Sequence, residues 1–214
     1  MRHFAIALGT LLVAGASTVA AQAVSEGTLV VQQGGKEIGR EDVVVRRGTP
    51  ASGAEGTTLA VNARYPASSP TIRIDASLDR NAAGEMEKFL LRGDTPEGPT
   101  QASAAGAGAR LIIKTAARAG ETGRELPGGP DVVVLDPNVY ALYAVVAELA
   151  TPEGRRLTAV YPRTNRRARF TARRSGNTVT LTGEIAGTIA VDGNGRIQRL
   201  ELPGENIVVV RAPR

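Results

Sequence analysis

The fold is decided by the stretch Leu135-Asp-Pro-Asn-Val-Tyr-Ala-Leu-Tyr-Ala-Val-Val-Ala-Glu-Leu-Ala-Thr-Pro152, which predicts the one convincing helix after the N-terminal leader. Asp136 suits the N-cap, and Pro137 suits the first helical position, where no N–H is needed. Pro152 disfavours helical backbone at the residue before it, so we expect a helix over 137–150. Apolar side chains cover most of its circumference, which is typical of a buried helix.

The segments around this helix predict short strands. Residues 59–65 and 72–78 alternate between apolar and polar side chains, which indicates sheets with one covered and one wet face. Gly34-Gly35 and Asp192-Gly-Asn-Gly195 are hairpin signals. We therefore predict a mostly β protein, a curved antiparallel meander sheet (a β-clam or half-barrel) packed around one buried helix.

Glycine and proline predict where the strands are interrupted. A long second strand is expected over 37–47, with Gly39 as a β-bulge. Residues 93–100 and 125–130 are expected to be loops. The Ala/Gly tract at 102–109 is expected to be a strand end followed by a loop, because its glycines disfavour a helix interior.

The N-terminus has the features of an export signal. Residues 4–19 form an apolar run, and Ala21-Gln-Ala23 is a small-x-small cleavage site. We predict a signal peptide over 1–23 and a single β-rich domain over 24–214, located in the periplasm or secreted. A membrane anchor is the alternative, but the apolar run is short for one, so no transmembrane segment is expected after signal removal.

The composition excludes several kinds of catalytic site. The chain has no cysteine, and its one histidine, His3, lies in the predicted leader. Thiolate and imidazole chemistry are therefore absent from the predicted domain. Asp75, Glu184 and Glu201 lie on predicted strands, where each is explained as the polar half of an alternating pattern. We assign no catalytic, cofactor-binding or metal-binding residue, and we expect no enzymatic activity.

The basic excess is modest, with 26 Lys and Arg against 21 Asp and Glu. Nucleic-acid binding is not expected, because aromatic residues that stack on bases make up only 3% of the chain. Arg167, Arg169 and Arg173 share one strand face. They suit an anionic headgroup, since guanidinium groups match phosphate and carboxylate, or they form an ordinary solvated face.

Two functional classes remain open from these patterns. In the first, the domain is a structural or protein-interaction module, for example one that binds another envelope protein. In the second, sheet and helix enclose an apolar small molecule such as a lipid. The side chains expected to line that space are Ile72, Ile74, Leu78, Tyr140 and Tyr143. Small inward residues such as Ala76 either leave such a space or let the helix approach closely.

Three stretches carry a family resemblance. They are Gly35-Lys-Glu-Ile-Gly-Arg-Glu41, Val134-Leu-Asp-Pro-Asn-Val-Tyr140, and Gly195-Arg-Ile-Gln-Arg-Leu-Glu-Leu-Pro203 with Val209-Val-Arg211. Their order resembles an uncharacterised group of exported bacterial β-rich proteins. The resemblance implies a curved antiparallel sheet folded over a helix, similar to the lipoprotein-carrier type of β-clam. It brings no catalytic residues to this chain, and a fold does not determine a function.

Overall fold

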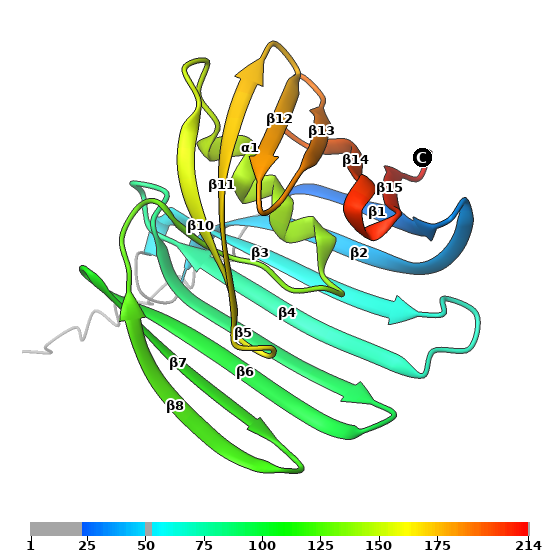
Figure 1. Cartoon of the computed structure of the whole chain (residues 1–214), viewed down its shortest axis with the longest axis vertical. Helices are drawn as coiled ribbons and strands as arrows, with labels where there is room; N and C mark the ends of the chain where they lie inside the picture. Colours follow the sequence, from blue (N-terminus) through cyan, green and yellow to red (C-terminus); the bar gives the residue numbers. More distant parts are fainter. Residues whose placement is uncertain (1–22, 50–52, 214) are drawn as a thin grey trace, which may run out of the picture.

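The computed structural model describes residues 23–49 and 53–213 (Figure 1). Apart from Ala23, the predicted signal peptide lies outside these ranges. The described residues form a mostly β structure with one short α-helix, which confirms the expected fold class. The boundary of the single domain at residue 24 stays a prediction.

The strands of the described chain divide into two groups, one before and one after the helix region. The first group is β1 (Ala23–Gln33), β2 (Lys36–Thr49), β3 (Gly53–Tyr65), β4 (Ile72–Arg80), β5 (Met86–Thr95), β6 (Gly98–Ala107), β7 (Arg110–Ala117) and β8 (Gly120–Pro127). The second group is β9 (Val132–Val134), which precedes the helix, then β10 (Arg155–Tyr161), β11 (Arg166–Ser175), β12 (Thr178–Gly183), β13 (Gly187–Val191), β14 (Ile197–Leu202) and β15 (Ile207–Arg211).

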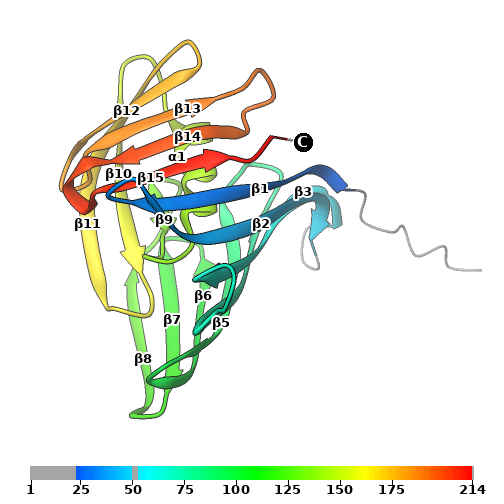
Figure 2. The same cartoon turned by 90° about the vertical axis from the view of Figure 1, so that its right-hand side faces the viewer.

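All of these strands belong to one sheet, in the order β8-β7-β6-β5-β4-β3-β2-β1-β15-β14-β13-β12-β11-β10-β9. It consists of two meanders joined by the antiparallel β1–β15 pair, and only β9 and β10 pair in parallel. The edge strands β8 and β9 follow each other in the chain across residues 128–131. Their shared loop brings the two edges together at one end, so the sheet curves around its interior (Figure 2).

The helix is shorter than predicted. A 3-10 turn, η1, covers Tyr140–Leu142, and the helix α1 covers Tyr143–Leu149. The predicted end near Ala150 is confirmed, but the predicted start at Pro137 is wrong. Residues 136–139 instead form a turn, with an isolated bridge between Asp136 and Val139. As Figure 1 shows, the helix lies inside the curve of the sheet, and its buried residues confirm the predicted burial.

The glycine-rich segments correct two expectations. The predicted loop over 93–100 is reduced to residues 96 and 97, because β5 ends at Thr95 and β6 begins at Gly98. β8 covers residues predicted to be a loop or left unassigned. The tract at 102–109 is a strand end followed by a turn, as expected, with residues 102–107 in β6. Pairing with β5 and β7 holds these weak strand formers in place, because strand propensity depends strongly on context. The predicted bulge is confirmed, since the β1–β2 register shifts where Val31 faces Gly39 and Gln32 faces Glu37.

The core lies between the inner face of the sheet and the helix. The alternation predicted over 59–65 and 72–78 is confirmed, since the inward side chains, including Val61 and Ile74, are buried. The two edges of the sheet are also linked farther along from the loop at residues 128–131, because the Thr115 hydroxyl on β7 donates to the carbonyl of Pro162 after β10.

Candidate functional site

Glu41, on β2, has a completely buried carboxylate beneath the start of the helical segment. Its Oε1 accepts hydrogen bonds from the Tyr140 backbone N–H at 2.7 Å and the Tyr65 hydroxyl at 2.9 Å. Its Oε2 accepts from the Ala141 N–H at 2.8 Å. These amides lie in the first turn, where N–H groups have no partner within the helix. A side chain from the sheet therefore caps the helix.

Asp136, the residue predicted to be the N-cap, has a different role. Its carboxylate accepts the Asn138 N–H at 3.0 Å and the Arg163 Nε–H at 2.7 Å. Asp136 is 2% exposed and forms a buried ion pair with Arg163. The predicted cap is thus wrong, because the turn over 136–139 delays the helix and places Asp136 opposite an arginine from the β10–β11 connection.

Burial sets the protonation behaviour of Glu41. Its pKa is raised from 4.5 to about 7, because desolvation raises the pKa by more than the three hydrogen-bond donors lower it. The negative charge of Asp136 adds a smaller upward contribution. No Lys or Arg of residues 23–49 and 53–213 forms an ion pair with Glu41, so nothing cationic offsets the loss of hydration.

The other end of the helix is held by arginines. Arg174 Nη2 donates to the Ala147 carbonyl at 2.8 Å, which satisfies a backbone group near the C-terminus. Arg80, which is 6% exposed, pairs with Glu148 at 2.6 Å. Polar contacts to β2, β4 and β11 therefore fix both ends of the helical segment.

The residues predicted to line an apolar site lie in this interior. Ile74, Leu78, Tyr140 and Tyr143 are buried, and Ile72 is partly buried against the same core. Of these residues, Leu78 borders a cavity of only about 10 Å³ between the helix, β4 and β9. Burial raises the pKa of the Tyr143 hydroxyl well above its usual range. A ligand at these residues stays a prediction.

The predicted arginine patch lies on the outside of β11. Arg167, Arg169 and Arg173 are exposed and share one face, opposite the buried Ala168 and Phe170. Their common orientation is as predicted. Whether they contact an anionic headgroup stays a prediction.

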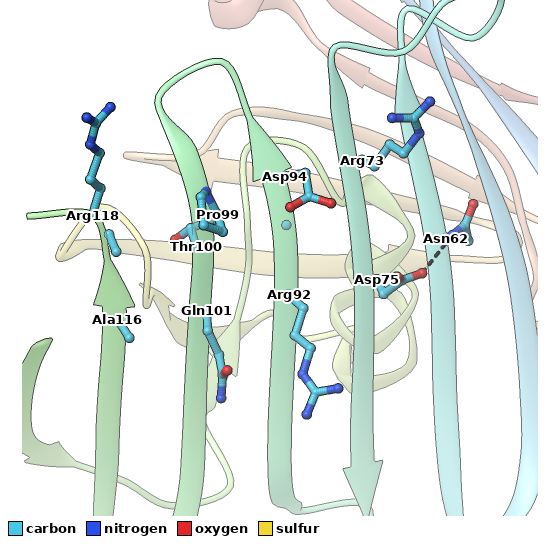
Figure 3. A pocket seen from close by; sticks show the side chains of 12 residues that line it. Asn62, Arg73, Asp75, Arg92, Asp94, Pro99, Thr100, Gln101, Ala116 and Arg118 are labelled. Atoms are coloured by element: carbon cyan, nitrogen blue, oxygen red, sulfur yellow. Dashed lines mark hydrogen bonds between the residues drawn. The ribbon is translucent and has the colours of Figure 1, made fainter. Parts of the chain in front are cut away.

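The outer face of β3 to β7 carries a groove with a volume of about 650 Å³. Polar side chains form a row across it, because Asn62, Asp75, Arg92 and Gln101 face one another in register on four neighbouring strands. Asn62 Nδ2 donates to Asp75 Oδ1 at 2.6 Å (Figure 3). The next row places Asp94 opposite Arg73, and Arg118 lies at the far side.

A second groove of about 330 Å³ adjoins the first. Both are lined by Asn62, Asp75 and Arg92, so these residues lie where the two grooves meet. Apolar side chains, including those of Val44 and Leu90, line the second groove. Figure 3 shows Arg92 and Gln101 extending side by side from neighbouring strands, away from Arg73 and Arg118.

The arginines that line the groove have no ionic or hydrogen-bonding partner for their side chains in the described parts of the chain. Arg73, Arg92 and Arg118 form no ion pair or side-chain hydrogen bond there, and Asp75 pairs with Asn62 instead of with Arg92. The lining thus presents three guanidinium groups and two carboxylates to solvent.

Sequence reasoning missed Glu41 and the groove for different reasons. A signal for Glu41 was present, since it shares the inward register of Val43 and Val45 on β2. The alternation also placed Asn62, Arg73 and Asp75 on the outer face. The groove itself depends on the curvature of the sheet, which no local pattern specifies.

Two further structural observations bear on function. Within residues 23–49 and 53–213, carboxylates do not gather in any group suited to a metal ion. Over the same residues, no helix has the length and hydropathy needed to cross a membrane.

Comparisons with known proteins support the fold alone. No family model and no curated protein matches the sequence. The structure is similar to a beta-barrel-like protein of the domain of unknown function DUF1849 from Brucella abortus, with a TM-score of 0.50, 11% identity, and coverage of 88% of this chain and 93% of that one. A DUF1089 family protein from Pseudomonas aeruginosa gives a TM-score of 0.47 and 13% identity, covering 94% of this chain and 98% of that one. The fold of the chain is thus similar to that of a beta-barrel-like protein of unknown function.

Proposed function

We propose that this protein is a non-enzymatic, exported binding module that holds its ligand in the outer groove over β3 to β7. The ligand class is a small molecule with a carboxylate or phosphate group. The observation that carries the proposal is Arg92, an exposed guanidinium at the junction of the two grooves that forms no ion pair within the described chain.

Other arginines provide the contrast. Arg64 pairs with Asp42 and Arg199 with Glu201, so nearby carboxylates commonly engage arginines in this molecule. Arg92 has Asp75 opposite it on β4, yet Asp75 bonds to Asn62. A free guanidinium offers a planar set of donors that matches the oxygens of a carboxylate or phosphate.

The ligand is expected to be amphipathic, because the groove changes character along its length. Arg73 and Arg118 lie in the polar part, and Val44 and Leu90 lie in the adjoining apolar part. An anionic group at Arg92 would leave an attached apolar part beside Val44 and Leu90.

The interior supports binding less well. The cavity of about 10 Å³ beside Leu78 is smaller than any lipid and is near the lower limit for one water molecule, and Ile74, Tyr140 and Tyr143 are buried in the core. The apolar-ligand class would therefore require the helix to move. Glu41 is sealed from solvent, and this supports a structural role for its carboxylate and not a catalytic one.

The proposal is tested by titrating the protein with acetate and with inorganic phosphate while recording backbone amide chemical shifts. We expect saturable shifts at Arg92, Gly93 and Thr100, and we expect Arg92→Gln to abolish them. Arg167→Gln is the matched control, because Arg167 is an exposed strand arginine outside the groove. It should leave the shifts unchanged.

The two probes also distinguish the ligand chemistry. A stronger response to acetate indicates a carboxylate ligand, and a stronger response to phosphate indicates a phosphate ester. If neither anion gives a saturable shift in the groove, the proposal is wrong, and the structural-module class is then favoured.

A further inference from the structure

We infer that Glu41 acts as a pH-sensitive latch, which holds the start of the helical segment against the sheet more firmly at acidic than at neutral pH. This inference is independent of the outer groove, because the Glu41 side chain faces the interior and bonds to Tyr65, Tyr140 and Ala141, none of which lines the groove.

The geometry of the latch joins distant parts of the chain. Glu41 is fully buried, and its two oxygens hold the Tyr140 and Ala141 amides, which are 99 and 100 residues away in sequence. Moving the first turn off the sheet breaks both bonds and brings water to the carboxylate. Docking and hydration of Glu41 are therefore coupled.

Within residues 23–49 and 53–213, no Lys or Arg forms an ion pair with the Glu41 carboxylate. Tyr65 faces the Glu41 carboxylate from β3, and Tyr140 faces it from η1. Burial raises the pKa of both hydroxyls above the usual value for tyrosine, so both stay neutral near pH 7. Asp136 adds negative charge, and its own arginine partner, Arg163, is already engaged.

The neighbours of Glu41 along β2 are also engaged elsewhere. Arg40 pairs with Glu37, and Asp42 pairs with Arg64, both on the outer face. Glu41 differs from these two neighbours because its side chain faces the interior, where burial raises its pKa to about 7.

The sign of the effect follows from proton linkage. Docked Glu41 has a pKa of about 7, whereas hydrated Glu41 returns toward 4.5. Between these values the docked state binds more protons, so raising the pH through this window favours the undocked state. The difference in pKa corresponds to a change in the opening equilibrium of about 300-fold at most.

Hydrogen exchange of the Tyr140 and Ala141 amides tests the latch. We expect their protection factors, corrected for the intrinsic pH dependence of exchange, to fall as the pH rises from 4.5 to 8. Glu41→Gln should remove this pH dependence, because glutamine does not titrate. Protection that is independent of pH in the wild type would overturn the inference.

Tyr65→Phe provides a second test that keeps the carboxylate. The Tyr65 hydroxyl donates to Glu41 and thereby lowers its pKa, so removing this donor should move the midpoint of the transition to higher pH. Tyr143→Phe is the control, because Tyr143 interacts with Tyr161 and makes no bond to Glu41. If the pH midpoint of amide protection is the same in Tyr65→Phe and Tyr143→Phe, the inference is also overturned. This comparison does not depend on whether Glu41→Gln folds.

Discussion

The inner and outer faces of strands β3 to β6 consist of alternating residues of the same strands, yet they differ in almost every physical property. The inner face presents small or apolar side chains, such as Val61, Ala76, Leu91 and Ala102, all buried. The outer face presents the row Asn62, Asp75, Arg92 and Gln101. A shift of one residue along a strand therefore changes a side chain from core to groove.

This difference indicates how each face is used. The inner face is covered by the helix and the second meander. The polar groups buried nearby, such as Glu41 on β2 and Asp136 before the helix, are satisfied by partners within the chain. The outer face is open, and its groove arginines Arg73, Arg92 and Arg118 form no ion pair in the part of the chain that the structure describes. Inner residues are thus expected to determine stability, and outer residues to determine binding.

The largest expected effect comes from Arg163→Ala. Removing this arginine leaves Asp136 buried without its cation, which should lower the free energy of unfolding by about 3–5 kcal/mol. Arg92→Ala on the outer face should change it by no more than about 0.5 kcal/mol. Urea denaturation of both variants measures the difference, and similar values would remove the contrast between the faces.

Leu142→Ala should have the next largest effect. Leu142 is 1% exposed in η1, and truncating such a residue costs about 2–5 kcal/mol. The outer control is Leu90→Ala, where the side chain is only partly buried, and we expect a loss below about 1 kcal/mol. Denaturant midpoints that fall equally would show that the helix does not determine stability.

Adjacent residues on β4 give the sharpest comparison. Ala76→Leu adds volume to the filled interior and should cost about 1–3 kcal/mol through overpacking. Ser77→Leu adds the same type of side chain to the outer groove, where there is room. It should leave the thermal midpoint nearly unchanged and weaken acetate and phosphate binding. A stable Ala76→Leu variant that gains affinity for a fatty acid would instead support an interior site.

The smallest effect is expected for the arginine patch on β11. Arg169→Ala removes an exposed side chain and should change the unfolding free energy by no more than about 0.5 kcal/mol. Binding of vesicles containing anionic lipid distinguishes the two interpretations of this patch. If the wild type binds these vesicles, salt weakens the binding and Arg169→Ala abolishes it, the result supports the headgroup site. If the wild type does not bind them, the result supports a solvated face.

Local sequence patterns were sufficient to predict much of the fold. Alternation over 59–65 and 72–78 specified which side chains point inward, because the period of a strand is two. The Gly34-Gly35 and Asp192–Gly195 turns specified where hairpins form, and both lie between paired strands. The continuous apolar character of the helical segment correctly indicated that it is buried.

Only the tertiary structure decided how the helix begins and which surface is open. Asp136 and Pro137 favour an early start locally, but the ion pair with Arg163 and the carboxylate of Glu41 place the first turn at Tyr140. The groove around Arg92 likewise depends on the register and curvature of neighbouring strands. Both features depend on contacts between residues far apart in the chain, whereas periodicity and turn chemistry report only on neighbours in sequence.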